Sequence, residues 1–540
     1  MANTTGINYV FVLMLENHSF DVMLSQSYAI NQVGPIAPVG SNQYLGETYL
    51  ATGPAPLSLT TDPGHELYDT LQQLTNINPF PPNPAPNLTP YPSAQFPADF
   101  KNGTGFVENY ATSTDEGTGL PQPGNFGDVV SCFSGTQLPV LNQLAKEFCV
   151  CTNWFSSIPG PTWPNRFFLH LASSNGMDCS PTTDQIEGWY EYDSNGFVSN
   201  NGSIFQALGN AGWNYRIYHD CDPTDDPLSS NYCCSDFSDD PANGGYSTGG
   251  GWVPQVGSLN GISSDSWNSV GGSFASDLAG TYNYQYTFIE PHYGDIYSGS
   301  YQGGSSQHPM DDVYGGEQLL KFVYETLRAS DIWNESLLIV TYDEHGGFYD
   351  SVPPPAAVPP GDGTTPGSNL NQFGFQFDQL GVRVPALLIS PLIAGGTIDD
   401  TQYDHTSVIA TLAELFGTAT NPLTLTNRDK AANHLLGTVT MAAPRTDCPK
   451  TLAAPTPNHN KKNPLSAAEK AKLDLEPLPR TGNLIGTMGT LHKIHRELSS
   501  KDPITQFFVR LRFKSVKTLG QLRAYSRHVA KKYHRRKKRK

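Results

Sequence analysis

Runs of apolar residues about as long as a β-strand alternate with segments of helical periodicity along most of the chain. The runs Tyr9–Leu15 and Leu337–Tyr342 contain almost no polar residues. A short, continuous apolar run is typical of a strand that is buried on both faces of a sheet. We expect further strands at 214–219 and 383–390, and helices at 137–148, 163–173, 203–212, 316–330 and 406–417.

This alternation predicts an α/β fold, with a mostly parallel central sheet that helices cover on both faces. The segments between these elements are long. Residues 76–104 are rich in Pro and Asn, 220–272 in Asp, Ser, Gly and Cys, and 353–374 in Pro and Gly. Loops of this length are usually functional or disordered, and we interpret them as insertions over a site at the carboxyl ends of the strands.

The pattern is lost after about residue 430, which predicts one domain over 1–430 and an appendage over 431–540. The appendage ends in a basic tail, because residues 514–540 hold twelve Lys and Arg and no Asp or Glu. The rest of the chain carries 21 basic and 50 acidic residues, a net charge of −29. An acidic body suits metal cations and argues against an obligate nucleic-acid partner. The tail is interpreted either as a solvated, disordered end or as a peripheral contact with an anionic membrane or with nucleic acid.

The cellular compartment is left open by the sequence. We find no signal peptide, because the apolar run after Tyr9 is short and leads into acidic residues. No segment approaches the roughly 20 apolar residues of a membrane-spanning helix. We therefore expect either a soluble, cytoplasmic protein or a processed start. The eight cysteines form no CxxC pair, which argues against a zinc ribbon.

Two of the expected strands end in clusters of oxygen-bearing side chains. "YVFVLML" runs into "ENHSFD", with Glu16 and Asn17, and "SLLIVTY" runs into "DEHGGFYD", with Asp343 and Glu344. Carboxylate and amide oxygens select hard divalent ions, so the four residues predict one ion of Ca²⁺, Mg²⁺ or Mn²⁺. Either cluster alone also fits a capped turn or a surface acid patch. Their shared position after predicted strands favours the metal site.

A hydroxyl nucleophile is predicted in "PGPTWPNRFF". Thr162 comes just before a helix expected to start at Pro164, where the helix dipole favours a phosphate. Bound to a divalent ion, Thr162 would be an activated alkoxide. Asn165 and Arg166 follow in the first turn and are candidates for holding phosphate oxygens. The alternative is that the Pro-Thr-Trp-Pro segment is only a rigid turn.

Five histidines stand in polar contexts beside Pro, Gly or acidic residues. One of them would protonate a leaving alkoxide, and each also fits a structural hydrogen-bonding role. His345 lies inside the second acid cluster, as a ligand or as a neighbour of the ligands. The other four are His65, His292, His308 and His405.

The sequence resembles the bacterial phosphoesterase family that contains the non-haemolytic phospholipases C and a group of acid phosphatases. Ten motifs carry the resemblance in the family's order over roughly residues 8–418, among them "ENHSFD", "DPGHE", "PGPTWPNRFF", "FIEPHYGD", "HPMDDVYGGE" and "TYDEHGGFYDSVPPP". The resemblance implies an alkaline-phosphatase-like α/β fold and hydrolysis of phosphate esters. It also implies a nucleophile that becomes phosphorylated, Thr162.

The resemblance further implies roles for the other candidate residues. Glu16, Asn17, Asp343 and Glu344 match metal-site positions, with Thr162 as a further ligand. His65, His292 and His308 would surround the phosphoryl group, with His308 preferred as the acid. Asn165 would help to stabilise phosphoryl charge. Substrate binding is assigned to Arg166, His345 and His405.

Three departures separate the chain from the family pattern. The first motif has His18 where Arg is usual, a short basic appendage replaces long carboxyl-terminal domains, and no export signal is visible. We expect a metal-dependent phosphate-ester hydrolase with a phospho-threonine intermediate, most simply a phospholipase C acting on phospholipids. An acid phosphatase acting on monoesters is the alternative. A non-catalytic binding protein on a degenerate hydrolase fold is the alternative of another class.

Overall fold

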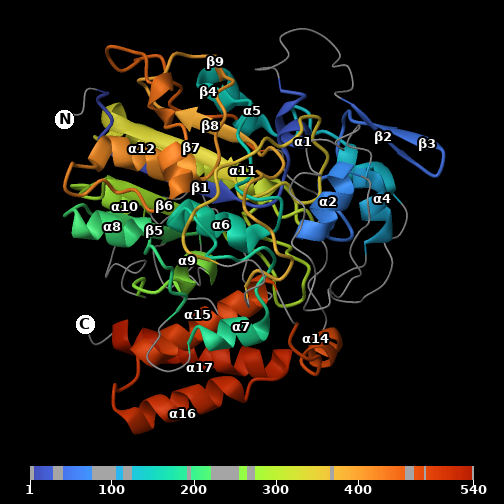
Figure 1. Ribbon diagram of the computed structural model, residues 1–540, viewed down its shortest axis with the longest axis vertical. Helices are drawn as coiled ribbons and strands as arrows, with labels where there is room; N and C mark the ends of the chain where they lie inside the picture. The colour runs from blue at the N-terminus through green and yellow to red at the C-terminus, as the bar shows by residue number, and fades with distance from the viewer. Residues whose placement is uncertain are drawn as a thin grey trace.

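The computed structural model describes residues 5–27, 40–75, 105–113, 125–190, 196–220, 254–263, 274–364, 370–455, 467–479 and 482–537. A seven-stranded sheet lies at its centre, in the order β5–β6–β1–β7–β8–β4–β9 (Figure 1). The strands are β1 (Tyr9–Leu15), β4 (Cys149–Cys151), β5 (Tyr215–His219), β6 (Tyr286–Glu290), β7 (Ser336–Tyr342), β8 (Ala386–Ile389) and β9 (Thr397–Asp399).

The sheet is mostly parallel, which confirms the predicted α/β class. β5, β6, β1 and β7 run in the same direction, and β8 is antiparallel to both of its neighbours. Every residue of β6, β7 and β8 is buried. The apolar composition of these strands follows from this position, because helices cover both faces of the sheet.

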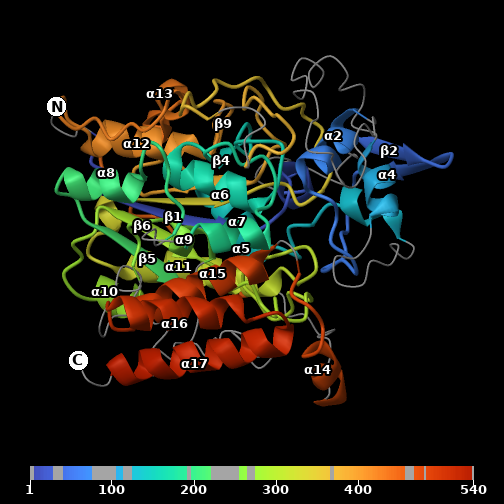
Figure 2. The same cartoon turned by 60° about the horizontal axis from the view of Figure 1, so that its bottom comes forward.

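Helices form one layer on each face of the sheet (Figure 2). These helices bury an apolar face against the sheet. In α11 this face is a stripe of buried residues at helical spacing: Leu319, Leu320, Val323, Tyr324 and Leu327. One layer holds α6 (Thr162–Leu171), α8 (Ile204–Asn210) and α12 (Thr406–Phe416). The other holds α5 (Pro139–Glu147), α10 (Phe274–Leu278) and α11 (Tyr314–Ala329).

Smaller elements surround this core. A hairpin lies with two helices at one edge of the body (Figure 1); it consists of β2 (Ser41–Tyr44) and β3 (Glu47–Leu50), beside α2 (Leu67–Thr75) and α4 (Gly105–Thr112). The other short helices are α1 (Phe20–Leu24), α7 (Thr183–Gly188), α9 (Pro254–Ser258), α13 (Asn427–Ala431) and α14 (Ala467–Leu473).

The predicted elements are all present, with small shifts at their ends. The strand expected at 383–390 is shorter, at 386–389, and the helix expected from Pro164 begins at Thr162. β2, β3, β4, β6 and β9 are not among the expected strands, because runs of three to five residues give little periodicity. The insertion at 76–104 and most of that at 220–272 lie outside the described residues, as do three of the cysteines; the five described cysteines are free thiols.

Three helices follow the body at the carboxyl end: α15 (Asn483–Glu497), α16 (Pro503–Lys514) and α17 (Leu519–Lys537). α15 packs against α7 and α9, and α16 and α17 both pack against α15. The segment before them stays on the body past residue 430, since the Tyr324 hydroxyl donates to Pro449 O (2.6 Å). Within the described part of the chain, no helix is both long and apolar enough to cross a bilayer.

Lys493 fastens α15 to the body and makes the stability of the protein depend on pH. Its buried Nζ donates to the carbonyls of Gly257 (2.8 Å) and Leu259 (2.6 Å). Burial lowers the pKa of Lys493 to about 7. Between about pH 7 and about pH 10 the unfolded state therefore binds more protons, so the free energy of unfolding contains a component that rises with pH.

We expect Lys493→Met to remove this rising component. The substitution also leaves two buried carbonyls without a donor, which costs about 1–3 kcal/mol each at neutral pH. Chemical denaturation at about pH 7 and about pH 9 measures both effects. Lys517→Met, at an exposed lysine, is the control and should keep the wild-type pH dependence. An unchanged pH dependence in Lys493→Met would contradict this assignment.

Candidate active site

The strand register brings four polar side chains to one edge of the sheet. Leu15 pairs with Tyr342, so Glu16 and Asp343 follow their strands at the same level. β6 lies on the other side of β1, and Leu13 pairs with Ile289, which sets Glu290 beside the end of β1. His219 pairs with Glu290 at the next strand. The carboxyl ends of parallel strands are the expected place for a ligand site, and here they are lined with acids.

The two predicted clusters contact each other directly. The backbone N–H of Asn17 donates to Asp343 Oδ1 (3.4 Å), and Asn17 has a left-handed φ of 45°. Gly346 comes so close to this turn that a Cβ on it would lie 2.2 Å from Asn17 O. The glycine after "DEH" is therefore needed for the two loops to meet.

Thr162 lies at the first position of α6, beside these loops. Asn17 Nδ2 donates to Thr162 Oγ1 (3.1 Å) and also to Glu344 Oε1. Pro161 is the N-cap residue, so Thr162 lies within the positive end of the helix dipole. A hydroxyl from one face of the sheet thus joins the carboxylates at the strand ends.

Asn165 supports the loop in front of Thr162. Its Oδ1 accepts from the Ile158 N–H (3.0 Å), and its Nδ2 donates to the carbonyls of Gly160 (2.8 Å) and Pro161 (3.1 Å). The amide is therefore committed to backbone groups. Its predicted role in stabilising the phosphoryl group stays a prediction, while the structure shows it holding Thr162 in position.

Arg166 links the carboxyl ends of three neighbouring strands through its hydrogen bonds. Its Nε donates to Asp343 Oδ2 (2.8 Å) and its Nη1 to Glu290 Oε1 (2.9 Å). Its Nη2 donates to the carbonyls of Met14 (3.3 Å) and Leu15 (3.4 Å). The guanidinium is fully buried and spans three neighbouring strands, which the planar fork of arginine suits. Contact with the substrate, as predicted, would have to compete with these four partners.

The carboxyl-terminal helices contribute a side chain to the same cluster. Asn483, the first residue of α15, donates through Nδ2 to Glu16 Oε1 (2.9 Å). Its Oδ1 accepts from Gln255 Nε2 (2.8 Å), and Gln255 Oε1 accepts from the Tyr293 hydroxyl (3.1 Å), which also donates to Glu290. Glu16 and Glu290 are therefore connected through the appendage. Neither Asn483 nor Glu290 is among the residues predicted from the sequence.

The cluster holds four buried carboxyl groups and one arginine: Glu16, Glu290, Asp343, Glu344 and Arg166. Burial and the nearby Asp343 raise the pKa of Glu16 well above its usual range, and burial raises the pKa of Asp343 to about 6 although Arg166 acts to lower it. Burial also acts to raise the pKa of Glu344, but the charges of His65 and His345 outweigh it and lower that pKa. Four carboxyl groups around one arginine repel one another when they ionise, and a bound cation would lower their pKa values and balance their charge.

Two oxygen atoms in the cluster lack a hydrogen-bond donor. Glu16 Oε2 and Asn17 Oδ1 are buried and have no partner among the described residues. Buried oxygens without partners are costly and need an explanation such as an ion. However, the described residues contain no group of three or more His, Cys, Asp and Glu side chains close enough together to hold a metal. A metal ion at this site would therefore need the Asn17 amide and the Thr162 hydroxyl as ligands besides the carboxylates.

His345 and His405 hold the second cluster in place. His345 Nδ1 lies 3.3 Å from Glu344 Oε2, and its Nε2 lies 2.7 Å from Gln73 Oε1. The Trp154 indole N–H donates to His405 Nδ1 (3.3 Å), so the Nε2–H of His405 donates to Asp343 O (2.6 Å). Burial lowers the pKa of His405 to about 4, in keeping with this neutral ring. Both contacts orient candidate ligands, and the predicted binding of substrate by these rings is untested.

His308 and His65 lie beside the acid clusters. The Met310 N–H donates to His308 Nδ1 (3.3 Å), so the proton of the neutral ring is on Nε2, 3.6 Å from Asp62 Oδ2. Burial, with His65 and His18 nearby, lowers the pKa of His308 well below its usual range. His65 donates through Nδ1 to Pro63 O (2.9 Å). A ring with its proton on Nε2 and a carboxylate next to it is suited to proton transfer.

His292 and His18 occupy other positions around the strand ends. The ring of His292 lies 6.3 Å from that of His219, and burial lowers the pKa of His292 to about 3. His18, which stands where the family pattern has Arg, is buried and stacks on Phe348 with ring centroids 4.5 Å apart. His18 therefore packs against the second loop instead of forming an ion pair.

Several known proteins are similar in sequence to this chain. The model of the phosphoesterase family matches residues 7–419. Non-specific phospholipase C3 of Arabidopsis thaliana is 31% identical over 467 residues, which cover 84% of this chain and 77% of that protein. Non-specific phospholipase C6 of the same plant is 32% identical over 84% of this chain and 76% of that protein. Non-hemolytic phospholipase C of Pseudomonas aeruginosa is 28% identical over 51% of this chain and 38% of that protein.

A solved structure of a protein in the alkaline phosphatase superfamily, from Vibrio parahaemolyticus, aligns over 80% of this chain and 95% of that chain. Its sequence identity is 10% and its TM-score is 0.29, too low to bear on the site or the substrate. The assignment rests on the family model and on the Arabidopsis relatives. By these matches the chain belongs to the phosphoesterase family and is a phosphoric ester hydrolase.

Proposed function

We propose that the protein is a phospholipase C that hydrolyses phospholipids through a phosphorylated Thr162. The observation that carries the proposal is the position of the Thr162 hydroxyl, at a helix N-terminus and 3.1 Å from the Asn17 amide beside Glu344. A hydroxyl in this position can attack phosphorus while the helix dipole favours the phosphate. The names of the curated relatives, all phospholipases C among those described above, support the substrate class.

We propose one divalent ion at this site, held by an amide and a hydroxyl as well as by carboxylates. Glu16, Asn17, Thr162, Asp343 and Glu344 would hold it, and the two oxygens without donors, Glu16 Oε2 and Asn17 Oδ1, belong to this set. A half-turn of the Asn17 amide, which exchanges its oxygen and nitrogen, would turn Oδ1 toward Thr162 and Glu344. Such an ion supplies positive charge that lowers the pKa of the hydroxyl and offsets charge on the phosphoryl oxygens. Oxygen ligands favour Ca²⁺, Mg²⁺ or Mn²⁺.

The reaction has two steps. In the first, Thr162 Oγ1 forms a bond to phosphorus, and the bond from phosphorus to the diacylglycerol oxygen breaks. His308, in its protonated imidazolium form, gives the Nε2 proton to that oxygen and then takes up the proton that Thr162 released, and diacylglycerol leaves. In the second step, water attacks the phosphothreonine, the headgroup phosphate leaves, and Thr162 regains its proton. Arg166 keeps Asp343 in place through both steps.

The direct test compares a diester with a monoester. Initial rates are measured on p-nitrophenylphosphorylcholine and on p-nitrophenyl phosphate under the same conditions. Release of nitrophenol from the choline diester, at a kcat/KM well above that for the monoester, supports a phospholipase C. Release from the monoester alone would replace the proposal with a phosphatase. No release from either substrate with a divalent ion present would contradict both.

Removal of metal gives a second test. We expect EDTA to abolish turnover of the diester, because the three buried carboxylates, the Asn17 amide and the Thr162 hydroxyl would then lack their cation. Adding back Ca²⁺, Mg²⁺ or Mn²⁺ one at a time should restore the rate with at least one of them. A rate that EDTA leaves unchanged after prolonged dialysis would exclude the divalent ion from the mechanism.

Asn483→Asp tests whether the appendage supports the candidate ligand Glu16. The new carboxylate would repel Glu16 in a buried site and lose the hydrogen bond that the amide now donates. We expect the divalent-ion concentration for half-maximal rate to rise about 10–100-fold, the usual cost of losing a partner of a metal ligand. Gln506→Glu is the matched control, because Gln506 bonds Arg496 near the carboxyl end of α15 and Ser500 in the turn after it, and none of the candidate ligands. Equal effects of the two variants would contradict a specific role for Asn483.

A further inference from the structure

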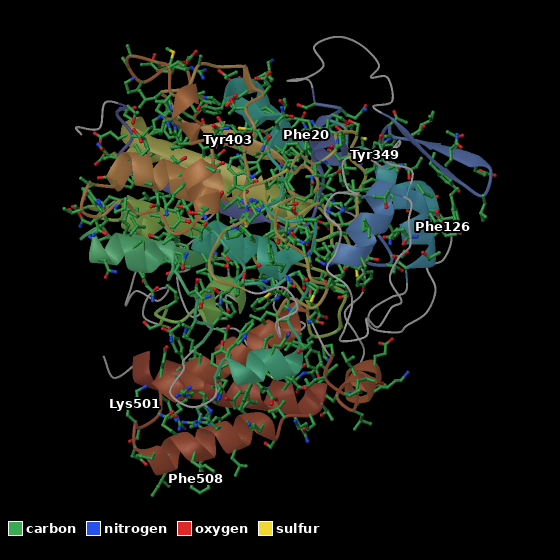
Figure 3. All side chains as sticks on the ribbon, in the orientation of Figure 1. Phe20, Phe126, Tyr349, Tyr403, Lys501 and Phe508 are labelled. Atoms are coloured by element: carbon green, nitrogen blue, oxygen red, sulfur yellow. The ribbon has the colours of Figure 1, made fainter. Side chains whose placement is uncertain are left out.

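One face of α16 exposes apolar side chains to solvent. Ile504, Phe507, Phe508 and Leu511 are 71%, 60%, 61% and 53% exposed. Their spacing of three, one and three residues places all four on one side of the helix. Figure 3 shows Phe508 at the outer edge of the molecule. Folded proteins seldom leave such a cluster in water without a partner for it.

The opposite face of α16 accounts for its attachment to the body. Gln506, Val509 and Phe513 are buried, and Phe513 stacks on His492 of α15 with ring centroids 4.1 Å apart. Gln506 Nε2 donates to Ser500 O (2.8 Å). The helix is thus held by its inner face, and its outer apolar face does not contribute to the fold.

Two basic residues flank this outer face along α16, and further exposed basic residues lie on α17. A period of 3.6 residues places Arg512 and Lys514 on opposite sides of the apolar stripe, and both are exposed. α17 exposes Arg527, Lys531 and Arg535 at a spacing of four residues. Residues 501–540 contain fifteen Lys and Arg and one acidic residue, while the rest of the chain is strongly acidic.

We propose that the outer face of α16, with its basic flanks, binds the surface of an anionic lipid bilayer. The phenylalanines and leucine would enter the region between headgroups and acyl chains, and the flanking Lys and Arg would contact anionic headgroups. Apolar side chains bordered by basic ones are the signature of helices that lie in a membrane interface. The net negative charge of the body is repelled by the same surface, which favours the carboxyl-terminal helices as the part that faces it.

This inference rests on the proposed function, because a phospholipid substrate presents such a surface. It also extends the role of the appendage, since α15 reaches Glu16 through Asn483 while α16 faces outward. One structural unit would then both complete the site and bring it to its substrate. A second copy of the chain is the other occupant to exclude, because its acidic body would also attract the basic helices.

The test measures binding to vesicles separately from turnover. Full-length protein with Thr162→Ala, which leaves the lipid intact, is sedimented with vesicles of phosphatidylcholine alone and of phosphatidylcholine with about a third phosphatidylserine. The same protein is tested with Phe507→Ser and Phe508→Ser together, and with Arg512→Gln and Lys514→Gln together. Val198→Ser with Val358→Ser, at two exposed apolar residues outside the carboxyl-terminal helices, is the matched control.

We expect binding to the anionic vesicles that the phenylalanine pair of substitutions weakens about tenfold or more, with no change in the control. The charge pair should remove the preference for anionic vesicles. Unchanged binding in the phenylalanine variant would overturn the proposal. So would a wild-type dimer in sedimentation equilibrium that the same variant converts to monomer while vesicle binding persists.

The outcome for the docking surface stays distinct from that for the enzyme activity. With Thr162 present, the phenylalanine variant should turn over soluble p-nitrophenylphosphorylcholine at the wild-type rate, which also shows that it is folded. Failure of wild type on this soluble diester overturns the proposed function. The vesicle experiment tests the proposed membrane-binding face of α16 independently of the enzyme activity.

Discussion

Thr162→Ala is expected to lower kcat for a phosphodiester about 10⁴-fold or more. Removal of a nucleophile leaves only the rate that binding and electrostatics provide. The side chain is largely buried and small, so its loss should change the free energy of unfolding little compared with its effect on turnover. Stopped assays on p-nitrophenylphosphorylcholine measure the ratio of the wild-type kcat to the variant kcat. Both values are expressed per folded molecule.

Thr162→Ser is the matched variant, because it keeps the hydroxyl at the helix N-terminus and beside Asn17 Nδ2. We expect it to retain turnover within about tenfold of wild type. If Thr162→Ala retained turnover at the level of Thr162→Ser, the nucleophile would have to be another group, and the mechanism proposed here would be wrong.

Arg166→Met is expected to produce the second large effect. The substitution leaves the carboxylates of Glu290 and Asp343 buried without their shared cation. Leaving a buried charge uncompensated costs about 3–5 kcal/mol, and loss of a residue that orients a metal ligand costs about 10–100-fold in activity. We expect both losses, measured by denaturant unfolding and by turnover per folded molecule.

Arg383→Met separates the two effects. Arg383 is also buried between two carboxylates, with Nε 2.8 Å from Asp350 and Nη2 2.9 Å from Asp21, and it bonds none of the candidate ligands. It should lower stability by a similar amount and keep turnover per folded molecule within about tenfold. Equal losses of turnover in the two variants would mean that Arg166 acts only through stability.

The meeting of the two acid clusters could be predicted from the sequence. β1 and β7 are long, continuously apolar runs, and each is followed at once by acids, so Glu16 and Asp343 must lie at strand ends. Parallel strands end at the same edge of a sheet. Thr162 could be predicted for a different reason, because it lies in a motif that matches the family.

Other parts of the site depend on contacts that no local pattern reveals. Asn483 is 467 residues from Glu16 in sequence and begins a helix with ordinary composition. Glu290 ends a five-residue strand, too short to stand out by periodicity. The sequence predicts that Arg166 binds the phosphate. Its contacts with Glu290 and Asp343 depend on the strand register, which places these carboxylates beside it. Tertiary packing alone decides these roles.

The carboxyl-terminal helices illustrate the same limit. Their sequence shows a basic tail, and it predicts an appendage beyond the body. The structure adds that α15 reaches the candidate site through Asn483, while α16 leaves Phe507 and Phe508 exposed. A segment that looks accessory in sequence therefore bonds a candidate ligand through one helix and exposes apolar side chains to solvent on another.

The most direct measurement of the central claim is a search for the covalent intermediate. Enzyme turning over p-nitrophenylphosphorylcholine is quenched in acid, in which a threonine phosphate ester survives, and the tryptic peptide that contains Thr162 is analysed by mass spectrometry. The mechanism predicts a phosphocholine adduct on Thr162 that is present during turnover and absent after substrate is exhausted. An unmodified peptide throughout turnover, with nitrophenol still released, would show that water attacks phosphorus directly and that Thr162 is not the nucleophile.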